Sequence, residues 1–218
     1  MAAERPQALL LDHAGVMTVP IGVALAAVCE SEGIEPDSVR MLIAAAYTGH
    51  PDGDDIVALE TGRMPLADFE TAFAARLRSR PGMPPPVAAG LVRRMFAVLP
   101  PNPRMLAVVR RARAAGVRTG LLSNTWGGAE GHDEAALGAL FDALVLSHEV
   151  GLRKPDPAIY ALAAGRLGVP AAACVVVDDL ITNVIGAREA GMRALHHEDD
   201  AATEAALEEL FGLAEAVR

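Results

Sequence analysis

Four apolar segments of this sequence each end in side chains that can take part in chemistry. Apolar segments of this length predict buried strands, and the carboxyl ends of parallel strands lie at one edge of a sheet, where ligands bind. The polar residues at the four ends are Asp12, Ser123-Asn124, Ser147-His148 and Asp178-Asp179. We therefore expect a functional site at the carboxyl edge of a parallel sheet.

Lysine is almost absent from the chain. Of the 19 basic residues, 18 are arginine, and the only lysine is Lys154. A compact ammonium and a planar guanidinium are not interchangeable. Lys154 lies in the loop "VGLRKPDP" after the third apolar segment, so it can reach the same edge of the sheet. We therefore predict a functional role for this lysine.

The acidic residues at this edge indicate a metal. Asp12, Asp178 and Asp179 would repel one another there unless a cation neutralised them. Carboxylate ligands without a His or Cys cluster favour a hard ion, and a few carboxylates with water and a substrate phosphate suit Mg²⁺. A lysine, a hydroxyl and an amide would then hold an anionic substrate. Aspartate can itself be the nucleophile in phosphoryl transfer, which makes Asp12 a candidate.

The elements that position these residues alternate along the chain. Strands are predicted at Ala8–Leu11, Val117–Leu122, Ala143–Leu146, Ala173–Val177 and Met192–Leu195. Helices are predicted at Arg104–Ala115, Glu134–Leu140, Asp156–Leu167, Leu180–Ala190 and Ala201–Leu213. Buried strands that alternate with helices predict an α/β fold, with a parallel sheet covered by helices on both faces.

The segment between the first two strands is different, because it has helical periodicity only. Helices are predicted at Ile21–Ser31, Pro36–Tyr47, Asp54–Thr61, Pro65–Leu77 and Pro86–Leu99. We therefore predict an all-helical insertion over residues 19–100, and a core made of residues 1–18 and 101–218. The proline-containing segments at 18–20 and 100–103 are expected to be the hinges.

Composition limits the class of protein. With 218 residues, 52% of them hydrophobic and 22% charged, the chain is expected to be globular. A net charge of −9 disfavours nucleic acid and anionic membranes as partners. No apolar stretch approaches the ~20 residues of a membrane span, and the first residues have no signal-peptide pattern. Cys29 and Cys174 fit no metal or redox spacing, so we expect a cytoplasmic protein with reduced cysteines.

Four stretches of the sequence resemble, in order, the four motifs of the haloacid dehalogenase superfamily of aspartate-nucleophile hydrolases. They are "LLLDHAGV", "TGLLSN", "EVGLRKPDPAIY" and "CVVVDDLITNVIGAREAGM". Together with the helical insertion, the resemblance covers essentially the whole chain. It implies a Rossmann-like core with a helical cap of the type inserted after the first strand.

The resemblance also implies roles for individual residues. Asp12 corresponds to the nucleophile, and Ser123 to the residue that binds the transferring group. Lys154 corresponds to the lysine that neutralises the nucleophile and the substrate anion. Asn124 and Asn183 match frequent polar positions nearby, and Asn124 is expected to bind substrate.

The implied Mg²⁺ site consists of Asp12, the backbone carbonyl of Ala14, Asp178 and Asp179. Ala14 departs from the pattern, because most phosphatases of the superfamily have a second aspartate there, which protonates the leaving oxygen and later activates water. Alanine keeps the carbonyl ligand but has no acid. General acid–base catalysis contributes about 10²–10⁴-fold to a rate, so the departure predicts a slower enzyme or one restricted to good leaving groups.

Three functions remain open from the sequence. The first is a Mg²⁺-dependent phosphatase-type hydrolase that acts on a small phosphorylated metabolite. The second is a 2-haloacid dehalogenase, for which Ala14 is tolerable because halide leaves without a proton; that chemistry needs no metal and leaves Asp178 and Asp179 unexplained. The third is a non-catalytic binding or regulatory protein with this fold.

Other residues are candidates to replace the missing acid or to contact the substrate. His13 is adjacent to Asp12, but alternation along an extended segment predicts that its side chain turns away. His132 lies in the glycine-rich loop "SNTWGGAEGHDE", which could fold over the edge of the sheet with Trp126. Tyr47 and Arg63 in the helical insertion are expected to be surface residues.

Overall fold

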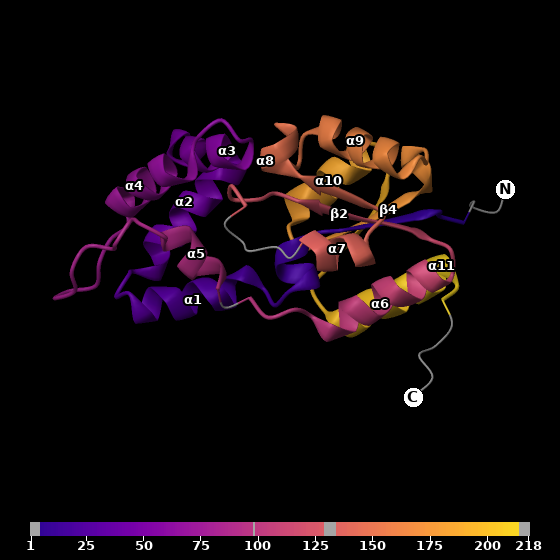
Figure 1. Ribbon diagram of the computed structural model, residues 1–218, viewed down its shortest axis with the longest axis horizontal. Coiled ribbons are helices and arrows are strands. Elements are labelled where there is room, and N and C mark those ends of the chain that lie inside the picture. The colour runs from indigo at the N-terminus through magenta and orange to yellow at the C-terminus, as the bar shows by residue number, and fades with distance from the viewer. Residues whose placement is uncertain (1–4, 98, 129–133, 214–218) are drawn as a thin grey trace.

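A computed structural model of the chain describes residues 5–97, 99–128 and 134–213. Its strands are β1 (Ala8–Leu11), β2 (Arg118–Ser123), β3 (Ala143–Leu146), β4 (Cys174–Asp178) and β5 (Arg193–His196). They form one parallel sheet in the order β3-β2-β1-β4-β5 (Figure 1). This confirms the predicted α/β fold with a Rossmann-like parallel sheet.

Helices cover both faces of the sheet (Figure 1). In β1, Leu9 and Leu11 pack toward α6 (Pro103–Ala114) and α11 (Asp200–Phe211). Ala8 and Leu10 point to the opposite face, toward α9 (Pro157–Leu167) and α10 (Ile181–Glu189). Because successive strand residues face opposite sides, an unbroken apolar strand can be buried on both. Two shorter helices, α7 (Glu134–Leu140) and α8 (Ser147–Val150), flank β3.

In the described part of the chain, five α-helices lie between β1 and α6 and form a separate group beside the sheet (Figure 1). They are α1 (Ile21–Ser31), α2 (Pro36–Thr48), α3 (Asp54–Glu60), α4 (Leu66–Arg76) and α5 (Leu91–Phe96). This group has its own apolar core, in which Trp126 from the loop after β2 packs against Phe69, Phe73 and Phe96.

One helix of this group is shorter than predicted, because α5 spans Leu91–Phe96 and not Pro86–Leu99. Gly90 has a positive φ of 72° and interrupts the helical backbone just before Leu91. The carboxylate of Glu70 on α4 accepts hydrogen bonds from the backbone N–H groups of Gly90 (2.9 Å) and Val92 (3.0 Å). The start of α5 is therefore set by a residue that is distant in sequence.

The chain passes between the sheet and this helical group twice, and the two passages lie side by side. Val19 N–H donates to the carbonyl of Pro100 (3.1 Å), and Asn102 N–H donates to that of Met17 (2.8 Å). Thr18 and Pro101 form an antiparallel bridge between these bonds. Both connections run through one paired ribbon.

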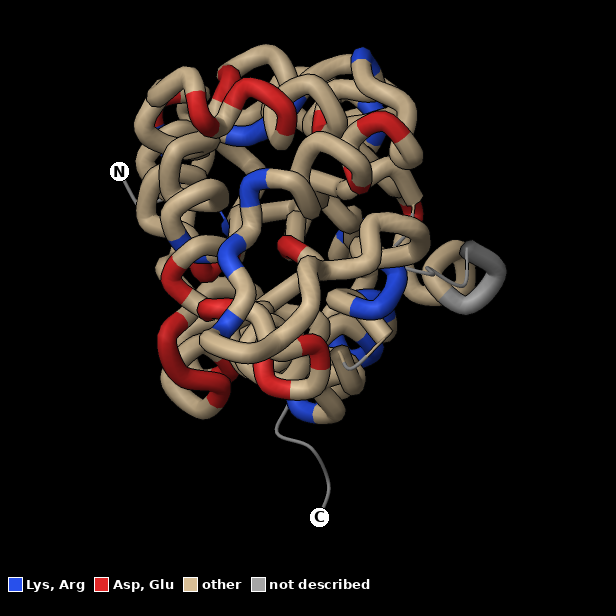
Figure 2. Tube along the Cα trace, turned by 90° about the vertical axis from the view of Figure 1, so that its left-hand side faces the viewer, with Lys and Arg blue, Asp and Glu red and all other residues tan. Residues whose placement is uncertain are grey.

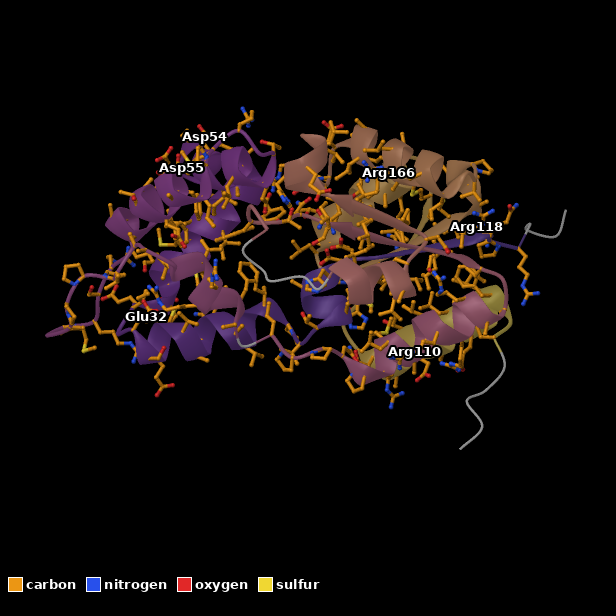
Figure 3. All side chains as sticks on the ribbon, viewed as in Figure 1. Glu32, Asp54, Asp55, Arg110, Arg118 and Arg166 are labelled. Atoms are coloured by element: carbon orange, nitrogen blue, oxygen red, sulfur yellow. The ribbon has the colours of Figure 1, made fainter. Side chains whose placement is uncertain are left out.

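Acidic and basic residues are interspersed over the end of the molecule formed by α1 to α5 (Figure 2). Charged side chains such as Asp54 on α3 and Arg110 on α6 lie on the outside (Figure 3). Within the described ranges, no helix is both long and apolar enough to cross a membrane.

Candidate active site

Asp12 follows β1 directly, at the edge of the sheet that faces α1 to α5 (Figure 1). Its backbone N–H donates to the carbonyl of Val177 in β4 (2.9 Å), which extends the strand pairing by one residue. The residue is buried, with 9% of its surface exposed, yet it lines a cavity between the sheet edge and the helical group. The sheet thus fixes a nearly buried carboxylate at the floor of a cavity.

Lys154 binds this carboxylate. Its Nζ donates to Asp12 Oδ1 (2.7 Å), to Asp178 Oδ2 (2.6 Å) and to the carbonyl oxygen of Leu122 (2.9 Å). An ammonium has three donors, so all three are used. The side chain is 1% exposed. Burial disfavours the charged form, but the two carboxylates outweigh it and keep the pKa of Lys154 above its ordinary value.

The acids at this edge are close together, since Asp12, Asp178 and Asp179 offer ligand atoms within 4.8 Å of one another. Burial, together with the charges of Asp178 and Asp179, raises the pKa of Asp12 to about 7 against the lowering effect of Lys154. Burial and the charge of Asp178 raise the pKa of Asp179 to about 6. Lys154 alone therefore does not balance the negative charge of the cluster.

Asp178 is held from both sides. Its Oδ1 accepts hydrogen bonds from Leu180 N–H (2.9 Å) and from Asn183 Nδ2 (2.9 Å), while its Oδ2 accepts from Lys154. The residue is fully buried. Its carboxylate therefore orients the lysine, and the backbone at the start of α10 and the Asn183 side chain orient the carboxylate.

The donor set fits a hard divalent cation. Carboxylate oxygens are ligands of the kind that Mg²⁺ prefers. Gly15 has a φ of 90°, and a Cβ at this position would lie 2.3 Å from Asp179 Oδ2, so the glycine leaves the room that the carboxylate occupies. Ala14, just before it, lines the cavity. The loop after β1 and the carboxylate of Asp179 are thus in close contact, as a shared cation site requires.

Asn124 and Ser123 end β2 next to this cluster, and both line the cavity. The amide of Asn124 binds the backbone of Lys154 from both sides, since its Nδ2 donates to Lys154 O (3.0 Å) and its Oδ1 accepts from Lys154 N–H (2.8 Å). The structure therefore brings the predicted residues together, and it adds that Asn124 positions the lysine loop. Ser123 is 4% exposed.

Ser147 and His148 end the third apolar segment but do not line the cavity. Ser147 Oγ accepts from Thr125 N–H (2.8 Å), and the His148 Nδ1 contacts Thr125 Oγ1. Both residues belong to α8. They support the loop after β2, which carries Ser123 and Asn124 at its start.

A buried ion pair above the site was not foreseen from the sequence. Arg153 Nε lies 2.7 Å from Glu60 Oε2, and Trp126 Nε1 donates to Glu60 Oε1 (3.2 Å). The Arg153 guanidinium also stacks on the ring of Tyr47, with 4.8 Å to its centroid. The signals available were an acid at helical spacing from Ile56 and an arginine beside Lys154, and neither signal specifies a partner.

Two interpretations from the sequence change here. His13 lines the cavity although alternation placed its side chain away. The backbone does not continue as a regular strand after Asp12, because it turns at Gly15, which has a φ of 90°. Tyr47, expected at the surface, also lines the cavity. Arg63 is exposed, as expected. His132 lies outside the described residues.

The parallel sheet carries a lysine-bound aspartate and an acid pair at its carboxyl edge, where they meet a cavity; this defines an α/β protein with a polar site at the end of its sheet. The sequence model of the haloacid dehalogenase-like hydrolases matches residues 6–191, and the chain belongs to this family. This confirms the resemblance seen in the four motifs. Proteins named as phosphatases are among the curated relatives that the chain matches.

Two curated relatives illustrate the range of the family. The sesquiterpene phosphatase astK of Aspergillus oryzae is 32% identical over 142 residues, which are 63% of this chain and 71% of that protein. A glyceraldehyde 3-phosphate phosphatase of Methanopyrus kandleri is 35% identical over 100 residues, 44% of this chain and 43% of that protein. In the second case the match spans less than half of the relative's length.

Among solved structures, a haloacid dehalogenase family enzyme from Bacteroides thetaiotaomicron in complex with magnesium and inorganic phosphate superimposes with a TM-score of 0.67. The superposition covers 88% of this chain and 94% of the other, with 17% sequence identity. At this identity the likeness establishes the shared fold.

Proposed function

We propose that this protein hydrolyses a small phosphate monoester through a phosphorylated Asp12. The observation that carries the proposal is the contact of Lys154 with both Asp12 and Asp178 at the floor of a cavity. The lysine holds one oxygen of Asp12 and places positive charge where the substrate phosphate would bind. Asp178 and the amide of Asn124 position the lysine, and Ser123, which lines the cavity, would bind the phosphoryl group.

The reaction takes two steps. The oxygen of Asp12 that Lys154 does not hold attacks phosphorus, and the bond from phosphorus to the ester oxygen breaks. Because Ala14 carries no acid, the leaving oxygen takes its proton from water. A second water then attacks phosphorus, the bond to Asp12 breaks, and inorganic phosphate leaves as the water's proton passes to solvent.

We propose that Asp12, the Ala14 carbonyl and Asp179 hold a Mg²⁺ ion, with Asp178 as a direct or water-mediated support. The fit rests on the oxygen donor set and on Gly15, which leaves room for the Asp179 carboxylate. When bound, the ion would neutralise negative charge on the acids and on the phosphoryl oxygens. The dehalogenase alternative gives no such use to the acid pair.

We also propose that residues 19–100 form a cap domain on a core of residues 1–18 and 101–218, hinged at the paired ribbon of Thr18 and Pro101. The separate apolar core of α1 to α5 supports these bounds. A cytoplasmic location is supported by Cys29 and Cys174, which are both buried and unpaired.

The test compares wild type, Asp12→Asn and the outer-surface control Asp54→Asn with p-nitrophenyl phosphate and Mg²⁺. We expect wild type and the control to release p-nitrophenol, Asp12→Asn to be inactive but folded, and EDTA to stop the reaction. BeF₃⁻ should modify wild type only. Activity retained in Asp12→Asn would refute the nucleophile. Metal-free release of chloride from 2-chloropropionate would favour the dehalogenase, and substrate binding without turnover would favour a non-catalytic protein.

A further inference from the structure

The cavity over Asp12 has one charged and polar wall and one mainly apolar wall. Its volume is about 400 Å³. The floor carries the charged and polar groups of the sheet edge, Asp12, Lys154 and Ser123. The opposite wall is mainly apolar and is formed by α1, α2 and α5, through Ile21, Leu25, Ile43, Ala44, Tyr47 and Phe96. An anionic group of a ligand would therefore bind at the floor of the cavity, and an apolar group of the same ligand would bind against the opposite wall.

Two charged side chains that line the cavity, Glu60 and Arg40, already form ion pairs within the protein. The carboxylate of Glu60 contacts Arg153 and accepts from Trp126 Nε1. Arg40, which also lines the cavity, donates to Asp37 (2.9 Å) and is largely exposed. A sugar-like ligand with several hydroxyls would have to leave some of them without a partner, and buried polar groups without partners are unfavourable.

The apolar wall continues onto the core. Leu180 and Ile181, at the start of α10 next to Asp179, line the cavity and are 37% and 48% exposed. Large side chains at this exposure gain from contact with an apolar ligand, because such contact removes apolar surface from water. Acidic and basic residues are, by contrast, interspersed along the backbone of the α1 to α5 end (Figure 2).

We infer that the organic part of the substrate is a hydrocarbon and not a sugar or another polyol. The phosphate would lie at Asp12, Lys154 and Ser123, and the hydrocarbon would lie against Leu25, Ile43 and Phe96. At ~30 Å³ for a small group such as a water molecule, the cavity holds about a dozen non-hydrogen atoms. This inference rests on the proposed function of the site and adds the class of its substrate.

Non-hydrolysable n-alkylphosphonates from ethyl to dodecyl test the inference by calorimetry with Mg²⁺, at concentrations where they stay monomeric. We expect the affinity to increase about two- to fourfold per methylene and to level off near eight carbons, because the phosphonate group takes about four of the dozen places. Glycerol 3-phosphate and glucose 6-phosphate should bind more weakly than decylphosphonate. Equal affinity for ethyl- and decylphosphonate, or tighter binding of the polyol phosphates, would overturn the inference.

A pair of variants on α1 locates the hydrocarbon. Leu25→Gln places an amide in the apolar wall, and Val23→Gln places the same group on the exposed side of the same helix, where Val23 is 61% exposed. We expect Leu25→Gln to reduce the affinity for decylphosphonate at least tenfold more than it reduces the affinity for ethylphosphonate. Val23→Gln should keep the dependence on chain length. An equal response of the two variants would contradict the placement.

Binding and turnover separate this inference from the function on which it rests. If wild type binds decylphosphonate with the expected chain-length dependence but does not hydrolyse p-nitrophenyl phosphate, the hydrolytic function fails and the apolar ligand stands. If it hydrolyses p-nitrophenyl phosphate but prefers polyol phosphates, the function stands and the apolar substrate class is wrong.

Discussion

The carboxylate of Glu60 on α3 lies 2.7 Å from the guanidinium of Arg153, the residue that precedes Lys154. The Glu60 and Arg153 side chains are 2% and 13% exposed. The pair therefore links the helical group to the loop that carries the lysine of the site. Burial raises the pKa of Glu60, although Arg153 and the Trp126 hydrogen bond lower it.

Removing one member of this pair should destabilise the protein strongly. We expect Glu60→Leu to lower the free energy of unfolding by about 3 to 5 kcal/mol, because it leaves a buried, unpaired arginine. Glu60→Leu with Arg153→Leu should recover most of the loss. Urea unfolding of both variants, with Arg76→Leu as a more exposed arginine control, measures the effect. A loss below ~1 kcal/mol in the single variant would show that the pair is solvated.

Lys154→Arg should reduce the rate although it keeps the charge. The ammonium has three partners within 2.9 Å and is almost completely buried, so a planar guanidinium has no room there. We expect kcat/KM for p-nitrophenyl phosphate to fall at least ~10-fold, a barrier increase of about 1.4 kcal/mol. The exposed arginine of α9 provides the control Arg166→Lys. A near-normal rate for Lys154→Arg would make the single lysine an accident of composition.

Asp179 should make the metal-free protein sensitive to pH. Its pKa is raised to about 6 in the folded state, so between pH ~4 and 6 the folded state binds more protons than the unfolded state. Its stabilising contribution is therefore lost as the pH rises through 6. In EDTA, the melting temperature of Asp179→Asn should rise relative to that of wild type as the pH increases from 4 to 7.

The same melting temperatures should be measured with Mg²⁺ added. A bound cation would stabilise the ionised acids, so added Mg²⁺ should raise the melting temperature of wild type at pH 7 and have little effect on Asp179→Asn. A constant difference between the two proteins over the pH range, with or without the ion, would contradict both the raised pKa and the metal site.

Ala14 predicts a steep dependence of rate on the leaving group. Without an acid, the leaving oxygen departs with nearly its full negative charge, so aryl phosphates should react much faster than alkyl phosphates. Ala14→Asp should help alkyl phosphates most, by up to ~10²-fold. The measurement is kcat/KM over a series of esters for both proteins. If wild type hydrolyses alkyl and aryl esters equally well with chemistry rate-limiting, another residue supplies the proton, and His132 is the first to test.

The sequence allowed the sheet and its polar edge to be predicted because strand periodicity is local. The apolar residues before Asp12 and Asp178 specify buried strands, and the strands' carboxyl ends bring the acids and Lys154 to one place. The bond from Lys154 to Asp178, as well as to Asp12, is a matter of three-dimensional distance and could not be derived from spacing.

The helical group was harder to predict in detail. Its helices follow from periodicity, but α5 begins where Glu70 from another helix accepts its first N–H groups. Tyr47 and Glu60 looked like ordinary helix residues, because the side of a helix that meets another part of the chain is not marked locally. Their place in the cavity wall depends on how the helical group packs against the loop of Arg153.

The paired ribbon of Thr18 and Pro101 has a consequence for how such proteins diversify. Since the two ends of segment 19–100 already meet in the core, that segment is in effect one very long hairpin loop, and changing its length costs little closure entropy. If the proposed function holds, evolution could therefore exchange the segment that would recognise the organic group and keep the segment that would break the phosphate bond. A chain with residues 19–100 replaced by a short Gly-Ser turn should, with Trp126 made polar, retain the parallel sheet by circular dichroism.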